Sequence, residues 1–114
     1  MNKTILITGA TGHIGRGLIP ILLEKNYNLI CTYNVKLPTI RKNKNIEWIK
    51  CNLKTSRIVL SNKYKIYCTI HLCGITNGRN ASDLEYFRCN EQTLLNTLES
   101  VKNKMKKFIF ISSQ

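Results

Sequence analysis

The chain has 114 residues, enough for one domain with a modest hydrophobic core. Its formal net charge is +12, from 18 basic and 6 acidic residues, and 43% of its residues are hydrophobic. No apolar run approaches the roughly 18 residues of a membrane-spanning helix, so no membrane partner is expected. Met1-Asn2-Lys3 leads directly into an apolar segment with no signal-peptide pattern, which predicts a cytoplasmic protein.

Two compositional features have ordinary explanations. The five cysteines are odd in number, widely spaced and without a Cys-x-x-Cys pair, so buried free thiols are favoured over disulfides or metal ligands. The positive charge is compatible with nucleic-acid binding. However, no nucleic-acid motif is present, and aromatic residues are not interleaved with the basic ones as a stacking platform requires. A solvated lysine-rich surface is therefore the favoured interpretation.

The segment Thr8 to Gly15 reads Thr-Gly-Ala-Thr-Gly-His-Ile-Gly and follows the apolar run Ile5-Leu6-Ile7. It predicts a strand, a glycine turn and the start of a helix. Glycine has no Cβ, so the backbone can turn sharply and its N–H groups can approach a pyrophosphate. The helix that follows directs its positive dipole end and unpaired N–H groups at the same anion. The segment therefore predicts a phosphate-binding cradle.

The predicted elements alternate in type along the chain. Strands are expected at residues 4–8, 29–33, 46–53, 66–72 and 108–111. Helices are expected at residues 13–26, with Pro20 inside, at 55–62, and from a cap at Ser82 or Asp83 to about 103. Segments 34–45 and 74–81 are expected to be loops. The long helix is expected to pack through an apolar face of Leu84, Phe87, Leu94, Leu95, Leu98 and Val101. This alternation predicts an α/β domain with a parallel sheet and helices on both faces.

The spacing Thr-Gly-x-x-Gly-x-x-Gly resembles the short-chain dehydrogenase/reductase superfamily. The segment GATGHIG before an aliphatic helix is most similar to its extended branch, the NAD-dependent epimerase/dehydratase family. Later landmarks of that family appear in the right order, as Cys51-Asn52-Leu53, His71-Leu72-Cys73-Gly74, Asn90-Glu91-Gln92-Thr93 and Ser112-Ser113. The resemblance implies a three-layer Rossmann fold with a parallel sheet of about five strands, truncated after strand five. Residues 1–114 would be its NAD(P)-binding domain, incomplete because the C-terminal substrate region is absent.

The resemblance also implies roles for individual residues. Gly9, Gly12 and Gly15 would shape the turn, and the backbone of Thr11, His13 and Ile14 would approach the pyrophosphate. Asn52 and Leu53 would flank the adenine, while Leu72, Cys73 and Gly74 would line the ribose and nicotinamide side. Ser113 is the expected active-site hydroxyl, with Ser112 as the alternative. His71 is expected to lie near the cofactor without acting as the general base.

The catalytic set is incomplete in this sequence. The superfamily's general base is a tyrosine in a Tyr-x-x-x-Lys motif, and no tyrosine here has a lysine four positions later. In the family this motif follows strand five, where the chain stops. We therefore expect the chain to bind a dinucleotide without turning over a substrate.

The cofactor preference depends on the end of the second strand. NAD-binding members place an acid there for the ribose hydroxyls, whereas this chain has Tyr33 and Asn34, with no acid between Glu24 and Glu47. The basic residues Lys36, Arg41 and Lys42 follow, and Arg16 is a second candidate partner for a 2′-phosphate. These basic residues are explained almost as well by charges that face solvent and bind no cofactor. The expected preference for NADP over NAD is therefore slight.

Taken with the resemblance, these features predict the NAD(P)-binding part of a nucleotide-sugar epimerase, dehydratase or reductase. The complete protein would use a nucleotide sugar and could form a homodimer. Three alternatives stay open: a non-enzymatic NAD(P)-binding module of regulator type, a truncated gene product, and a basic nucleic-acid binder. No metal ion is expected.

Overall fold

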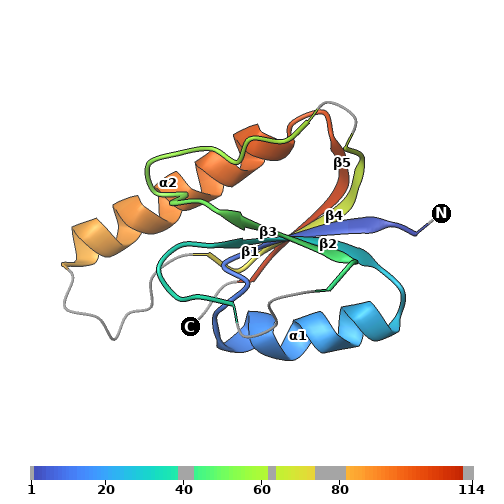
Figure 1. The fold of residues 1–114 in the computed structure, drawn as a ribbon. Coiled ribbons are helices and arrows are strands. Elements are labelled where there is room, and N and C mark those ends of the chain that lie inside the picture. The colour runs from blue at the N-terminus through green and yellow to red at the C-terminus, as the bar shows by residue number, and fades with distance from the viewer. Residues whose placement is uncertain (1, 39–42, 62–63, 74–81, 112–114) are drawn as a thin grey trace.

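The computed structural model describes residues 2–38, 43–61, 64–73 and 82–111. These residues form a five-stranded parallel sheet in the order β3-β2-β1-β4-β5, with helices on both faces (Figure 1). The predicted α/β fold with a parallel sheet is therefore confirmed. The strands are β1 (Thr4–Thr8), β2 (Asn28–Tyr33), β3 (Ile46–Lys50), β4 (Ile66–His71) and β5 (Met105–Phe110), and the helices are α1 (His13–Glu24) and α2 (Asp83–Val101).

The central strand β1 is apolar because both of its faces are covered. Ile5 and Ile7 belong to one buried cluster with Ile19 of α1. Leu6 belongs to a second cluster with Val101 of α2. The sheet therefore separates two cores, and α1 and α2 lie on opposite sides of it (Figure 1).

Helix α1 runs through Pro20 and ends close to the predicted position. Proline lacks an N–H, so one helical hydrogen bond is lost without ending the helix. The helix ends at Glu24, and Asn26, two residues later, turns the chain away with a backbone φ of 66°. The N–H of Tyr27 then bonds the carbonyl of Leu22 at 3.2 Å, which closes the end of the helix.

The short helix predicted at residues 55–62 is wrong for the described residues 55–61, which have no helical structure. Hydrogen bonds to helix α2 keep this segment in a non-helical conformation instead. The Asn96 side-chain amide donates to the Leu53 carbonyl at 2.7 Å, and the Ile58 N–H donates to the Ser100 hydroxyl at 2.8 Å. Leu53 and Ile58 are buried beneath the segment. These tertiary bonds and the buried apolar side chains outweigh the local helical pattern.

Helix α2 begins as predicted, because the Ser82 hydroxyl accepts a bond from the Glu85 N–H at 3.1 Å. Its predicted apolar face is largely wrong, since Leu84, Phe87 and Leu95 are exposed. The buried face carries small and polar side chains, which allow the helix to lie close to the sheet and to segment 51–61. The buried residues are Cys89, Thr93, Thr97, Ser100 and Val101.

Candidate dinucleotide-binding site

A cavity of about 790 Å³ lies at the carboxyl ends of the strands. In the strand order β3-β2-β1-β4-β5, the chain winds outward from β1 toward β2 and, separately, from β4 toward β5. The loops after β1 and β4 therefore diverge, and they leave the crevice in which open α/β sheets bind ligands. Gly9 and Gly12, from the turn after β1, and Leu72 and Cys73, after β4, line this cavity.

At two positions of the turn a Cβ atom would collide with the backbone, so glycine is required there. Gly9 has a φ of +64°, and a Cβ there would lie 2.9 Å from the Cα and N of Cys73. A Cβ at Gly15 would lie 2.3 Å from the Ala10 carbonyl oxygen. Glycine at these positions lets the turn pack against the end of β4 and lets α1 pack against the turn.

Gly12 has a different role at the start of α1. A Cβ there would meet only the Gly9 carbonyl oxygen, at 3.4 Å, so space next to it is open. Gly12 is the N-cap of α1 and provides no side-chain hydrogen bond, and the first turn contains no acid. The first N–H groups of the helix therefore keep their positive end available to an anion at the cavity. This arrangement fits the pyrophosphate of a dinucleotide.

The predicted residues of the turn divide into two groups. Gly9, Thr11 and Gly12 line the cavity. His13, Ile14, Gly15 and Arg16 do not line it: Gly15 is buried under the turn, and the other three side chains are exposed. Only the backbone of His13 and Ile14 was expected to approach a phosphate, and their place in the first turn of α1 is compatible with that expectation. The exposed Arg16 lies outside the cavity lining, whereas Lys36, another of the predicted basic partners of a 2′-phosphate, lies within it.

A hydrogen-bonded centre at Thr8 joins the turn to β4. Its hydroxyl oxygen receives the N–H groups of Leu72 and Cys73 at 3.2 and 3.3 Å and lies 2.8 Å from Nδ1 of His71. Burial lowers the pKa of His71 to about 4, so its ring is neutral near pH 7 and pairs with the Thr8 hydroxyl.

The end of β2 forms one wall of the cavity. The N–H of Gly9 donates to the Thr32 hydroxyl at 3.2 Å, and the N–H of Ala10 donates to the Thr32 carbonyl at 2.9 Å. The following residues Tyr33, Asn34 and Lys36 also line the cavity. The Tyr33 ring packs edge-on against Trp48, with 6.2 Å between the ring centroids. No acid lies in this wall, in agreement with the sequence.

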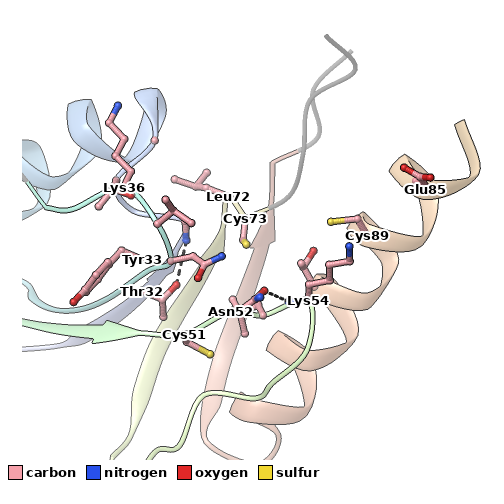
Figure 2. Close-up of a pocket in the computed structure, with 17 residues that line it drawn as sticks. Thr32, Tyr33, Lys36, Cys51, Asn52, Lys54, Leu72, Cys73, Glu85 and Cys89 are labelled. Carbon is pink, nitrogen blue, oxygen red and sulfur yellow. Dashed lines mark hydrogen bonds between the residues drawn. The ribbon is translucent and has the colours of Figure 1, made fainter. Parts of the chain in front are cut away.

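The opposite wall combines the segment after β3 with helix α2. Asn52 and Leu53 line the cavity as predicted, and the Asn52 side-chain oxygen accepts the Lys54 N–H at 3.1 Å. That oxygen has a second lone pair, so it can still accept a bond from an adenine amino group. Figure 2 shows Glu85 and Cys89 of α2 across the cavity from Lys36 and Tyr33, with Cys73 between the two walls.

The sequence did not identify every residue of the cavity. The α2 residues are separated by four positions, so they share one helix face, and this spacing was a usable signal. The segment after β3 also lines the cavity, and its non-helical course was not predicted because a helix was expected at residues 55–62. The additional lining residues are Thr32, Val35, Cys51, Lys54, Glu85, Cys89 and Thr93.

Some predicted site residues lie outside the described residues. They are Gly74, the expected active-site Ser113, its alternative Ser112, and the basic residues Arg41 and Lys42. Among the residues that the structure does describe, no cluster of His, Cys, Asp or Glu could hold a metal ion, and the cysteines are free thiols. Neither described helix is long and apolar enough to cross a membrane.

A model of the NAD-dependent epimerase/dehydratase family matches residues 5–114. The chain belongs to this family. It is 31% identical over 115 residues to CDP-abequose synthase from Salmonella muenchen, and the match covers 99% of the chain and 38% of the synthase. A second match, to an uncharacterized oxidoreductase, YmfI, of Bacillus subtilis (strain 168), is 53% identical over 34 residues and covers 30% of the chain and 14% of that protein.

Solved structures of the epimerase/dehydratase type have the same fold. UDP-galactose 4-epimerase superposes with a TM-score of 0.76 at 22% identity, over 97% of the chain and 38% of that structure. MoeE5, in complex with UDP-glucuronic acid and NAD, superposes with a TM-score of 0.75 at 23% identity, over 96% of the chain and 36% of that structure. The chain thus spans less than half of the length of these proteins.

Proposed function

We propose that the chain is the NAD(P)-binding part of a nucleotide-sugar epimerase, dehydratase or reductase. The observation that carries the proposal is the uncapped N-terminus of α1 at Gly12, which opens on the cavity at the carboxyl edge of the sheet. Membership in an NAD-dependent family and the MoeE5 complex with NAD and a nucleotide sugar support it.

The walls of the cavity suggest how a dinucleotide would be held. The α1 N-terminus and the backbone around Gly12 would bind the pyrophosphate. Asn52 and Leu53 would flank the adenine, and Leu72 and Cys73 would line the nicotinamide side. The dinucleotide would supply hydride transfer, and the chain's own contribution is to bind and orient it.

We further propose a preference for NADP over NAD. Lys36 lines the cavity three residues after Tyr33, at the wall where NAD-specific members present an acid. A lysine ammonium there can pair with a 2′-phosphate, whereas an acid would repel it. Lys36→Gln tests this directly: NADPH should bind several-fold more weakly while NADH is unaffected. Equal loss for both cofactors would refute the preference.

We propose that these 114 residues bind the cofactor without turnover, because the Tyr-x-x-x-Lys motif is absent from them. Ser113 is the proposed active-site hydroxyl of the complete catalytic set. Isothermal titration with NADPH and NADH, followed by a hydride-transfer assay with CDP- and UDP-sugars, tests both parts. Binding without turnover is expected. Clear turnover would refute the second part, and absence of binding would refute the first.

The missing motif equally favours a second candidate, a non-enzymatic NAD(P)-binding module of regulator type. The two candidates differ in what surrounds the chain in its gene. A reading frame that continues into Tyr-x-x-x-Lys would support the enzyme. A natural protein that binds NAD(P) and lacks that motif throughout would support the regulator.

A further inference from the structure

The edge of the sheet opposite the cavity is basic. All five strands are parallel, so their amino ends lie together, at the end where the N-terminus is seen in Figure 1. A lysine stands within three residues before each strand, and in spatial order from β3 to β5 these five are Lys44, Lys25, Lys3, Lys65 and Lys104. Together with Lys107, the third residue of β5, they form what we name the amino rim.

Backbone bonds link two pairs of neighbouring strands at the amino rim. The Asn28 N–H donates to the Lys3 carbonyl at 2.9 Å and so links the starts of β2 and β1. The Ile66 N–H donates to the Lys104 carbonyl at 2.7 Å, which links β4 and β5. With a spacing of about 4.8 Å between strands, the five lysines extend over about 19 Å.

The centre of the rim gathers two like charges around one ring. Nζ of Lys3 lies 4.1 Å from the ring centroid of Tyr67. Nζ of Lys107 lies 5.2 Å from the same centroid and 3.3 Å from the Tyr67 hydroxyl. The Lys107 hydrogen bond and both positive charges lower the pKa of Tyr67, as expected in a field of this sign. Lys3, Tyr67 and Lys107 are distant in sequence, so only the fold brings aromatic and basic side chains together.

The charges around Tyr67 have no carboxylate partner, because within the described residues no salt bridge pairs Lys3 or Lys107 with a carboxylate. The Glu47 carboxylate instead accepts the Tyr64 hydroxyl at 2.5 Å. Among the described residues, eight lysines and three glutamates lie in or beside the amino half of the sheet, namely Lys3, Lys25, Lys44, Lys65, Lys102, Lys104, Lys106 and Lys107 and Glu24, Glu47 and Glu99.

We infer that the amino rim binds the phosphate backbone of a nucleic acid, with Lys3 and Lys107 as a phosphate clamp preorganised by Tyr67. A bound phosphate relieves the repulsion between the two ammonium groups. A row of charges fits a chain of phosphates better than a lipid surface. In the part of the chain that the structure describes, no exposed large apolar side chain lies within three positions of Lys44, Lys25, Lys3, Lys65 or Lys104 in the sequence, whereas insertion into lipid needs apolar anchors. This inference is separate from the dinucleotide site, which occupies the other edge.

Salt dependence gives the first quantitative expectation. Each lysine–phosphate contact with a single strand adds about −0.7 to the slope of log K against log salt concentration. Contacts from five of the rim lysines would therefore weaken binding about 100-fold between 50 and 200 mM salt.

A charge-matched pair of variants tests the location. Lys3→Gln with Lys107→Gln removes two charges from the rim, whereas Lys50→Gln with Arg88→Gln removes two exposed charges from the carboxyl half. Binding of a fluorescein-labelled single-stranded RNA of mixed sequence is measured by anisotropy, with circular dichroism to confirm the fold. The rim pair should bind about 25-fold more weakly at 100 mM salt, and the control pair should bind almost as the parent chain does.

Three results would overturn the inference. Equal losses in the two pairs would show an effect of net charge alone. Competition by NADPH would place the RNA at the carboxyl edge. Phosphatidylserine vesicles that bind as tightly as RNA at equal salt, with the same loss in the rim pair, would assign the rim to membranes. RNA binding that NADPH leaves unchanged and that the rim pair alone weakens supports it.

Discussion

Replacing Gly12 with alanine separates dinucleotide binding from folding more cleanly than any other change in the glycine turn. Gly12 has a φ of −74°, which alanine adopts without strain, and its added Cβ would meet only one atom, at 3.4 Å. That Cβ would enter the open space of the cavity, where the proposed pyrophosphate approaches the first turn of α1.

The expected magnitudes follow from this geometry. Alanine is a poorer N-cap than glycine, so the free energy of unfolding should fall by at most about 1 kcal/mol. A methyl group between the helix N-terminus and the pyrophosphate should weaken NADPH binding at least tenfold, or about 1.4 kcal/mol. Gly17→Ala is the matched control, because a Cβ there meets nothing within 4 Å. It should stabilise α1 by about 0.5–1 kcal/mol and leave binding unchanged.

The chain contains its own reporter for the measurement. Trp48 is the single tryptophan and packs against Tyr33, which lines the cavity. Quenching of its fluorescence by NADPH gives the dissociation constant, and urea unfolding gives the stability of each variant. If Gly12→Ala binds NADPH as tightly as the parent chain, the pyrophosphate does not lie at Gly12 and the proposed pose is refuted.

Other predictions concern packing and pH. Gly15→Ala should unfold the domain, since its Cβ would lie 2.3 Å from the Ala10 carbonyl oxygen; a cooperative melting transition like that of the parent would contradict this. Asn96→Leu removes the bond to the Leu53 carbonyl and should weaken binding of ADP more than that of nicotinamide mononucleotide; equal losses would count against a role in shaping the adenine wall. His71 has a pKa of about 4 when folded and about 6.5 when unfolded, so the folded chain binds fewer protons between these values. Stability should therefore rise with pH across this window, by at most about 3 kcal/mol, and His71→Asn should flatten the profile; an unchanged profile would exclude His71 as its cause.

Local signals were sufficient to predict most of the sheet and the turn. Ile5, Leu6 and Ile7 form a continuous apolar run, and this run is the middle of the central strand. The glycine spacing predicted the turn because Gly9 and Gly15 fill places where any Cβ would collide with backbone. In these cases the chemistry of a few neighbouring residues determines the local structure.

The failures occurred where distant residues decide the structure. Segment 55–61 has a local pattern compatible with a helix, but Asn96 and Ser100 of α2 hold it open from more than forty positions away. The buried face of α2 is small and polar because the sheet and segment 51–61 approach it closely, and a count of leucines cannot show that. The amino rim was missed for the same reason, since Tyr67 meets Lys3 and Lys107 only across neighbouring strands.

The central claim is that a dinucleotide binds at the N-terminus of α1, and amide chemical shifts test it most directly. An ¹⁵N-labelled sample of the chain is titrated with NADPH, and the shift of each assigned amide is followed. The largest shifts should occur at Gly12, His13 and Ile14, with smaller ones at Leu53 and Cys73. Saturable shifts confined to the amino rim, or no saturable shift at millimolar NADPH, would contradict the proposed site.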